Sequence, residues 1–294
     1  MQTVLIFGGS GFLGSYVSDE LIKRGYRIII ADIKRPRYLN NKLKFIKADI
    51  LDAAKVKKIV TDNIQFVYNF AGLTDIDLSF TSPFETVNLN VLGNLNILEA
   101  CRIKNIKRFI YASSAYAFSN KGSFYGVSKF ASEKIIEEYA TRYKLNYTII
   151  RYGSLYGERA GEHNGIYRLL KQAIVNKNIK YKGTGEEVRE YIHAKDAAKL
   201  SVDILGNKEF INEHVVLTGV ERLKQKDLLI MISEILNDEI KIEFLKNKPK
   251  GHYKVTPYSF NPKIAKKLVT NPYIDMGQGL VECMRVIFEE IQSN

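Results

Sequence analysis

The sequence predicts an α/β protein built on a doubly wound parallel sheet with helices on both faces. Three observations lead to this prediction. Short apolar runs alternate with longer segments of helical periodicity along the first half of the chain. A glycine-rich turn, GGSGFLG at residues 8–14, directly follows the first apolar run. After about residue 155 the alternation breaks, so we expect a smaller α/β cap in the C-terminal half.

The first half of the chain reads as repeated strand–helix–strand units. Apolar runs typical of buried parallel strands occur at residues 3–7, 27–31, 44–47, 65–70, 107–112 and 146–151. Helices are expected between them at residues 12–24, 52–62, 84–104 and 125–143. In such sheets ligands bind beyond the carboxyl ends of the strands, so the residues that follow each strand are the candidates for a site.

The second half is less regular. We expect helices at residues 165–177, 196–205, 225–236 and 277–291, with strands near 179–181, 214–218 and 240–244. Asp196 is expected to cap the helix that follows it. This pattern predicts a main domain at residues 1–155 and a cap at 156–294, with some segments of the cap region returning to the main domain.

Composition excludes several classes of protein. Hydrophobic residues make up 46% of the chain and charged residues 26%, no run approaches a membrane span, and the N-terminus has no basic leader, so we expect a cytoplasmic protein without a membrane partner. The net charge of +12 comes from lysines spread along the chain, without an arginine-rich arm, so no nucleic-acid partner is expected. The charge reflects either a solvated lysine-rich surface or a preference for anionic ligands.

Cysteine and histidine spacing predicts no metal site. Cys101 and Cys283 lie far apart in helical patterns, so we expect reduced thiols. The four histidines show no ligand spacing and are expected to be structural or exposed: His163, His193, His214 and His252.

The glycine turn predicts a dinucleotide site of the Rossmann type. Gly9, Gly11 and Gly14 follow a strand and open a helix, which permits close approach of a pyrophosphate to the helix N-terminus. Asp32 lies 18 residues after Gly14, at the end of the next strand, where a carboxylate can bind both ribose hydroxyls. This favours NAD, although the basic residues Lys34, Arg35 and Arg37 could tolerate the 2′-phosphate of NADP. A glycine turn alone could bind nothing, but the strand, helix and acid together favour the cofactor.

Tyr125, Lys129 and Ser114 form a candidate catalytic group. Tyr125 and Lys129 are four residues apart, so both side chains lie on one face of a helix. A lysine ammonium near a phenol favours the phenolate, which can then exchange a proton with a substrate hydroxyl. Ser114 follows a strand and could hydrogen-bond the same hydroxyl. The spacing alone is common, but beside a dinucleotide turn it predicts hydride transfer between an alcohol and a ketone.

The sequence resembles the extended short-chain dehydrogenase/reductase family, which contains the nucleotide-sugar epimerases and dehydratases. The resemblance covers nearly the whole chain. Besides the glycine turn and Y-x-x-x-K, it rests on ADI at 48–50, NFAGL at 69–73, NVLGN at 90–94, SSAYAF at 113–118, RYGSLYG at 151–157, VREYIH at 188–193, NPK at 261–263 and GQGL at 277–280.

The resemblance implies a role for individual residues. The catalytic residues would be Ser114, Tyr125 and Lys129. Contacts to NAD would come from Gly8, Gly11, Phe12, Leu13, Asp32, Asp49, Ile50, Ala71, Lys129 and Tyr152. The nucleotide-diphosphate sugar would contact Thr74, Ser154 and Arg189, the last of these at the diphosphate unless it is simply a surface arginine. The C-terminal part would be a substrate-binding cap, and the helices at 84–104 and 125–143 would form a homodimer interface, unless their apolar positions only pack on the sheet.

Three features of the sequence depart from the family pattern. Tyr125 comes only 11 residues after Ser114, where relatives usually carry a longer, proline-containing loop. Ser154 replaces a common asparagine. Ala115 and Tyr116 stand where hexose 4,6-dehydratases usually have acidic residues, and elimination needs a base for the C5 proton. Tyr116, or a cap residue such as Glu158 or His163, could supply that chemistry.

We therefore expect an NAD-dependent enzyme that oxidises a nucleotide sugar at C4. The leading prediction is a nucleotide-sugar 4-epimerase in surface-glycan biosynthesis. The alternatives within the family are a 4,6-dehydratase and a net C4 dehydrogenase or reductase. A non-catalytic NAD-binding regulator is the alternative outside it, and the presence of both Tyr125 and Lys129 argues against that.

Overall fold

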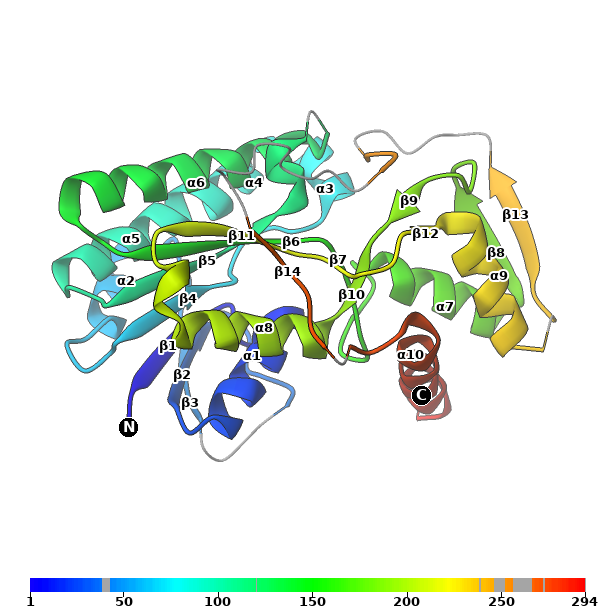
Figure 1. Cartoon of the computed structure of the whole chain (residues 1–294), viewed down its shortest axis with the longest axis horizontal. Coiled ribbons are helices and arrows are strands. Elements are labelled where there is room, and N and C mark those ends of the chain that lie inside the picture. The colour runs from blue at the N-terminus through cyan, green and yellow to red at the C-terminus, as the bar shows by residue number, and fades with distance from the viewer. Residues whose placement is uncertain are drawn as a thin grey trace. The chain divides into compact units, whose positions relative to one another are not determined.

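The computed structural model describes residues 1–38, 43–119, 121–237, 239–245, 252–255, 266–271 and 273–293. The chain divides into two compact units (Figure 1). The first unit comprises Met1–Tyr152, Ala198–Leu217 and Pro257–Leu268, and the second comprises Gly153–Ala197, Thr218–Thr256 and Val269–Asn294. None of the described helices is long and apolar enough to span a lipid bilayer.

The first unit contains a parallel sheet in the order β14-β11-β6-β5-β4-β1-β2-β3. Among the described residues, its eight strands are β1 Thr3–Phe7, β2 Arg27–Asp32, β3 Leu43–Lys47, β4 Phe66–Asn69, β5 Arg108–Ser114, β6 Tyr147–Tyr152, β11 Glu213–Leu217 and β14 Lys266–Leu268. Every residue of β1, β4 and β6 is buried, as the continuous apolar runs predict. The predicted doubly wound sheet is confirmed. The strand order reverses between β1 and β4, the switch point at which such sheets bind ligands.

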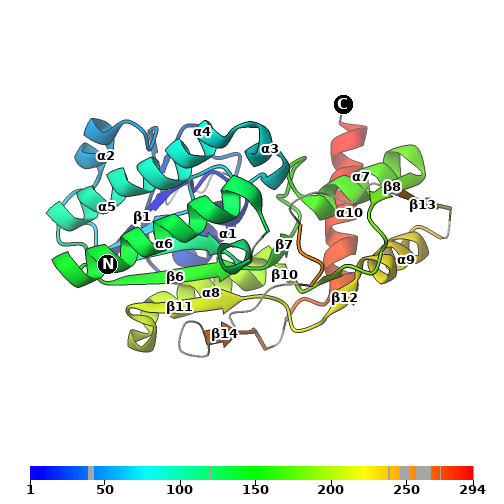
Figure 2. The same ribbon diagram turned by 90° about the horizontal axis from the view of Figure 1, so that it is seen from above.

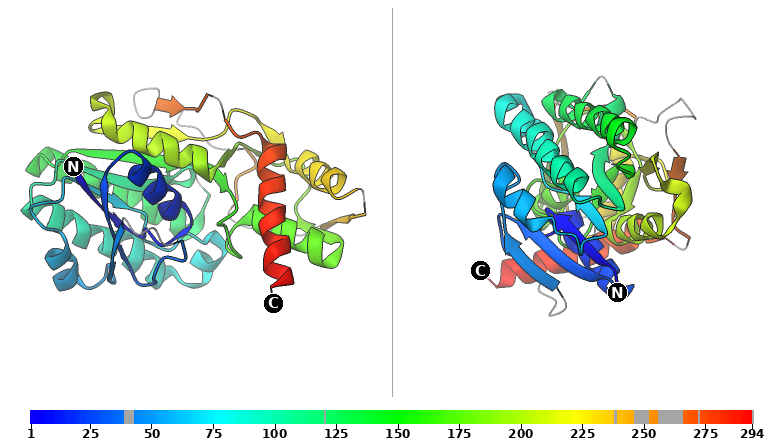
Figure 3. Two further views of the ribbon diagram at one scale, coloured as in Figure 1. Left: turned by 90° about the horizontal axis from the view of Figure 1, so that it is seen from below. Right: turned by 90° about the vertical axis from the view of Figure 1, so that its left-hand side faces the viewer.

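Helices cover both faces of this sheet (Figures 1 and 3). They are α1 Phe12–Lys23, α2 Ala53–Ile59, α3 Ile76–Thr81, α4 Pro83–Val87, α5 Gly93–Ile103, α6 Ser123–Tyr143 and α8 Ala194–Gly206, the first turn of α8 belonging to the second unit. The α2, α5 and α6 helices share one apolar core with the sheet, which includes Val56, Leu98 and Ile136. On the other face, the hydroxyl of Tyr68 donates to the Ser201 carbonyl of α8 at 2.8 Å.

The expected helix at 84–104 is present but divided. A π-helical turn, Asn88–Leu92, separates α4 from α5. Such turns insert an extra residue into a helix and are frequent at functional sites. The expected strand at 214–218 is β11, which pairs with β6 in the main sheet.

The described part of the second unit contains short paired strands and three helices. The strands are β7 Ser154–Tyr156, β8 Asn178–Lys182, β9 Val188–Arg189, β10 Tyr191–His193, β12 Leu223–Lys224 and β13 Lys241–Leu245, paired as β10-β7, β12-β9 and β13-β8. The helices are α7 Gly165–Asn176, α9 Gln225–Ile235 and α10 Met276–Gln292. Leu170, Ile232 and Leu280 join these helices in a separate apolar core, and Figure 2 shows α7 beside α10.

The prediction for Asp196 was wrong. It lies inside the first turn of α8 rather than before it, and its Oδ2 accepts a hydrogen bond from the Ile274 N–H at 2.8 Å. The carboxylate therefore fixes the chain segment that leads into α10. The NPK motif at 261–263 lies outside the described residues.

Candidate active site

The glycine turn after β1 packs directly on the loop after β4. Gly8 has a φ of +75°, and a Cβ atom there would lie 2.5 Å from the Ala71 nitrogen. A Cβ atom on Gly14 would lie 2.4 Å from the Gly8 carbonyl oxygen. The structure therefore brings Gly8 and Ala71 together at the switch point of the sheet, and no larger residue fits at either glycine without displacing backbone.

The start of α1 lies in the same turn. Gly11 is the N-cap and carries no side chain that could accept the first N–H groups of the helix. These groups and the helix dipole are suited to an anionic group. Phe12 is half-buried and Leu13 is buried at this end of α1.

The turn also orients Asp32, the residue predicted to bind the ribose. Asp32 ends β2, and its two carboxylate oxygens accept hydrogen bonds from the Ser10 N–H and the Lys34 N–H, each at 3.0 Å. The Ser10 hydroxyl is buried without a hydrogen-bond partner among the described residues. An unsatisfied buried hydroxyl beside a helix N-terminus is suited to a ligand acceptor such as a pyrophosphate oxygen. The turn therefore fits a bound dinucleotide.

The remaining predicted cofactor contacts lie in the same unit. Asp49 is exposed, with Oδ1 accepting from the Leu51 N–H at 2.9 Å, whereas Ile50 is buried against Gly93 of α5. Tyr152 ends β6 with its ring buried, and its hydroxyl is 2.7 Å from Ser201 Oγ.

The predicted catalytic residues come from two neighbouring elements. Ser114 is the last residue of β5, and Tyr125 and Lys129 occupy the first two turns of α6; all three are buried. The Lys129 Nζ atom donates to the Ala112 carbonyl at 2.9 Å and lies 5.9 Å from the centre of the Tyr125 ring. Burial lowers the pKa of Lys129 to about 8, and the negative charge of Glu133 opposes this shift.

The loop after β4 also reaches this group. A Cβ atom on Gly72 would lie 4.0 Å from Lys129 Nζ. The segment that begins at Ala71 therefore lies between the glycine turn and Lys129, which places the candidate cofactor and catalytic residues in one region of the first unit.

Tyr116 packs on the candidate catalytic tyrosine. Its ring lies edge-on to the Tyr125 ring with centroids 6.3 Å apart, and its N–H donates to Ser114 Oγ at 3.2 Å. It occupies a short 3₁₀ turn, Ala115–Phe118, that links β5 to the segment before α6. Gly122, with a φ of +92°, leaves the space that the Tyr116 ring fills, since a Cβ atom there would lie 2.7 Å from the ring.

Asn90 is a buried residue of the π-helical turn to which the sequence assigned no role. Its Oδ1 accepts from the Leu73 N–H at 2.8 Å, and its Nδ2 donates to the Leu73 carbonyl at 3.0 Å and to Ser128 Oγ at 2.9 Å. Ser132 Oγ donates to the Asn90 carbonyl at 2.7 Å. Asn90 thus ties the loop after β4 to α6. Asparagines also stand at positions 88, 94 and 96, so the sequence did not single out Asn90 among them.

The predicted substrate contacts are divided between the units. Thr74, in the first unit, is exposed. In the second unit, Ser154 begins β7 and is half-buried, and the Arg189 guanidinium lies 4.4 Å from the centre of the Tyr253 ring.

The second unit also contains an acidic cluster that linear spacing did not reveal. Glu158, His193 and Glu282 offer ligand atoms within 4.8 Å of one another. Lys195 Nζ contacts both carboxylates, at 2.5 Å from Glu158 and 2.8 Å from Glu282. The Lys195 ammonium lies between the two carboxylates, so the cluster is explained by ion pairing.

Residues 4–218 match the model of the NAD dependent epimerase/dehydratase family. The chain belongs to this family. It is 29% identical to a Methanocaldococcus jannaschii protein named "Putative UDP-glucose 4-epimerase", over 94% of this chain and 95% of that protein. It is 30% identical to the dTDP-D-glucose 4,6-dehydratase of Bos taurus, over 69% of this chain and 64% of that protein. A mutant of the UDP-glucuronic acid 4-epimerase of Bacillus cereus has been solved in complex with NAD and UDP-4-deoxy-4-fluoro-glucuronic acid. Its structure has the same fold as this chain, with a TM-score of 0.88 and 23% sequence identity. The match covers 98% of this chain and 100% of that one.

Family membership and the structure together confirm four of the predictions. The fold class and the family resemblance are as expected, and NAD is the cofactor of the family. The protein is an enzyme of the nucleotide-sugar epimerase and dehydratase class rather than a non-catalytic regulator.

Proposed function

We propose that the protein is a nucleotide-sugar 4-epimerase. The observation that carries this proposal is the arrangement of Ser114, Tyr125 and Lys129 beside a dinucleotide turn, with Ala115 and Tyr116 where elimination would call for carboxylates. The names of the M. jannaschii relative and of the B. cereus structure, both 4-epimerases, support the same reading.

The residues of the chain would supply binding and proton chemistry. Tyr125, as phenolate, takes the proton of the C4 hydroxyl and later returns it, while Ser114 orients that hydroxyl. The Lys129 ammonium favours the phenolate. NAD, when bound, supplies the acceptor and donor of a hydride at C4.

The cofactor would be held at the switch point. The start of α1 and the Ser10 hydroxyl would bind the pyrophosphate, Asp32 the ribose, and Gly8, Gly11, Phe12, Leu13, Asp49, Ile50, Ala71 and Tyr152 would complete its surroundings. We keep Thr74, Ser154 and Arg189 as proposed contacts to the nucleotide sugar.

A 4,6-dehydratase is the second candidate, because the bovine relative is named as one. Elimination needs a base for the C5 proton and an acid for the departing hydroxyl. The Tyr116 ring packs edge-on against the Tyr125 ring, and a neutral phenol is a weaker base than a carboxylate. This observation favours epimerisation.

The test is incubation of the purified protein with a panel of UDP-, GDP- and dTDP-sugars, followed by mass and NMR analysis. Epimerisation leaves the mass unchanged and inverts C4, dehydration removes water, and net oxidation removes two hydrogens. Tyr125→Phe should abolish turnover, whereas Tyr139→Phe, on the same helix with its hydroxyl bonded to Glu99, should retain it. Loss of water from the accepted sugar, or full turnover by Tyr125→Phe, would contradict the proposal.

We also propose a homodimer formed through α4, α5 and α6. Large apolar side chains are exposed on these helices, including Phe84 at 78%, Val127 at 66% and Phe130 at 40%. Full burial of an exposed side chain of this kind contributes about 1.5–3 kcal/mol, and burial of these side chains against a second copy would contribute in proportion to their exposed fraction.

A further inference from the structure

Glu133 is a fully buried carboxylate on the helix that carries the proposed catalytic residues. It follows Lys129 by four residues and Tyr125 by eight on α6, and its side chain has 0% exposure. An ionised carboxylate removed from water is strongly unfavourable unless it is paired and hydrogen-bonded. The partners that stabilise it lie on the strands that lead into the site.

The inner partners of Glu133 come from β5 and β6. Arg151 donates to both carboxylate oxygens, from Nε at 3.0 Å and from Nη2 at 2.8 Å, in a bidentate pair. The hydroxyl of Ser113 donates to the same carboxylate. Ser113 and Arg151 are register partners on the two strands, and Ser113 immediately precedes Ser114. Glu133 therefore clamps both strands at the level of Ser114.

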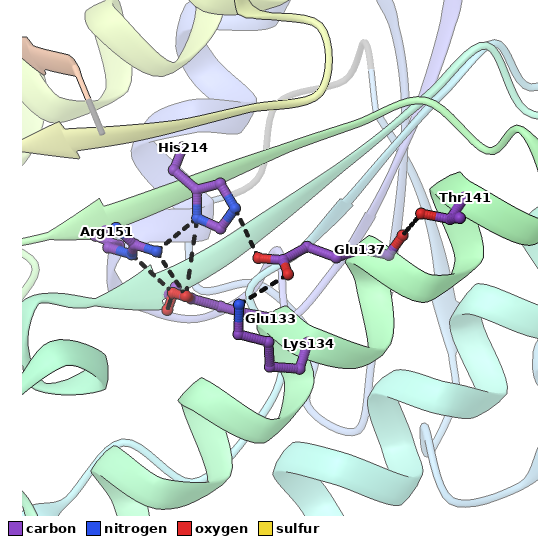
Figure 4. A network of polar contacts seen from close by, with 7 residues as sticks. Glu133, Lys134, Glu137, Thr141, Arg151 and His214 are labelled. Carbon is purple, nitrogen blue, oxygen red and sulfur yellow. Dashed lines mark hydrogen bonds and ion pairs between the residues drawn. The ribbon is translucent and has the colours of Figure 1, made fainter. Parts of the chain in front are cut away.

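A second set of residues, which includes His214 and Glu137, connects Arg151 back to α6 (Figure 4). His214 of β11 accepts from Arg151 at 2.6 Å through Nδ1, and its Nε2 lies 3.1 Å from Glu137, one turn beyond Glu133. Glu137 also pairs with Lys134 at 2.9 Å. Its hydrogen bond with His214 is the largest cause that lowers the pKa of Glu137 to about 2, so this carboxylate stays ionised. Three strands and one helix are thus joined by charge-assisted hydrogen bonds.

We propose that Glu133 is a positioning residue for the active site: through Ser113 and Arg151 it holds the strand end that carries Ser114 against the helix that carries Tyr125 and Lys129. This inference rests on the proposed function for the roles of those three residues. A shift of α6 by about 1 Å would move the Tyr125 phenol away from the Ser114 hydroxyl, and catalysis is sensitive to misplacements of that size.

Glu133 also supplies the negative charge that acts on Lys129. Lys129 is 3% exposed, and the Glu133 charge raises its pKa against the lowering effect of burial. Arg151 alone, without Glu133, would add a buried positive charge and act in the opposite direction. Loss of the carboxylate should therefore move Lys129 toward its neutral form at pH 7, in which it no longer favours the phenolate.

The competing explanation is a buried ion pair that serves stability only. The two explanations differ in what a variant would change. A stabilising pair affects the unfolding midpoint, whereas a positioning residue affects the titration of Lys129 and the value of kcat. Replacing a whole buried ion pair by apolar residues is often neutral for stability, which allows the two effects to be separated.

The first experiment does not depend on turnover. The full chain, labelled with ¹³C and ¹⁵N in lysine, is titrated by NMR, with the Lys129 signal assigned from Lys129→Arg. We expect Glu133→Gln to lower the Lys129 midpoint by at least half a pH unit and Glu133→Asp to restore most of it. Glu138→Gln, an exposed carboxylate on the same helix, should leave it unchanged. An unchanged midpoint in Glu133→Gln would overturn the electrostatic part of the proposal.

The second experiment measures catalysis with a sugar that the wild type accepts. The double variant Glu133→Leu with Arg151→Met should keep an unfolding midpoint close to wild type while kcat falls at least tenfold and KM changes less than threefold. Ser113→Ala, which removes one hydroxyl and leaves the ion pair, should lower kcat in the same direction. Wild-type kcat in a stably folded double variant and in Ser113→Ala would overturn the positioning role. If the wild type accepts no sugar, the proposed function fails, and the lysine titration still decides for Glu133.

Discussion

Replacing Lys129 by methionine should stabilise the folded protein at neutral pH while it abolishes activity. The pKa of Lys129 is lowered from 10.5 to about 8 because the ammonium is buried. Below about pH 8 the lysine is charged in both the folded and the unfolded chain, so the full penalty applies, about 3 kcal/mol at 1.36 kcal/mol per pKa unit. Loss of the hydrogen bond to Ala112 costs about 1 kcal/mol, which leaves a net gain of about 2 kcal/mol.

The sign of the pH dependence makes this prediction specific. As pH rises through the folded-state pKa, the native lysine loses its proton before the unfolded one does, so the wild type gains stability and its deficit against Lys129→Met shrinks by about 2 kcal/mol between pH 7 and pH 9.5. Urea unfolding at several pH values, followed by far-UV circular dichroism, measures this. Lys134→Met, one turn later and with 56% side-chain exposure, serves as control. A stability difference between Lys129→Met and wild type that stayed constant over this range would refute the reasoning.

The remaining predictions concern the loops and the surface. Asn90→Leu removes three buried hydrogen bonds and should lower the free energy of unfolding by about 3 kcal/mol, whereas Asn96→Leu, which loses one bond, should cost about 1 kcal/mol; equal costs in urea unfolding would argue against this account. Gly14→Ala should weaken NAD binding at least tenfold by calorimetry because its Cβ has no space, while Gly165→Ala, which meets nothing within 4 Å, should bind normally. Val127→Glu should convert a dimer to a monomer in light scattering, and a wild-type monomer would remove the dimer proposal.

The sheet was predictable because its pattern is local. Strands such as β1 and β6 are continuous apolar runs, and burial on both faces of a parallel sheet requires that composition. The position of the candidate site followed from the same pattern, since the carboxyl ends of parallel strands meet at one edge. This is why Gly8, Ala71 and Ser114, far apart in the sequence, could be assigned to one region.

Features set by distant partners were not predictable. The division of the helix at 84–104 leaves its apolar spacing nearly intact, so the π-helical turn and the inward orientation of Asn90 depend on the loop and helix that Asn90 joins. The strands β9 and β12 have two residues each and carry no alternation to recognise. Aspartate is a residue type that often caps helices, but the Asp196 carboxylate accepts a hydrogen bond from the N–H of Ile274, 78 residues further along the chain.

The arrangement of α6 shows how the site is maintained at the expense of local stability. Its N-terminal turns carry a buried lysine that destabilises the folded state, and the next turns carry Glu133 and Glu137, which bind Arg151 and His214 on the neighbouring strands. The carboxylate that raises the pKa of Lys129 is also paired with Arg151, so its charge is largely compensated and the pKa of the buried lysine stays low. If Glu133 served Lys129 alone, the lysine would be held as a fixed cation. With Arg151 present, Lys129 is mainly protonated at pH 7, and its pKa of about 8 lies about one unit above that pH. A residue that modulates the protonation of a phenol requires such a pKa.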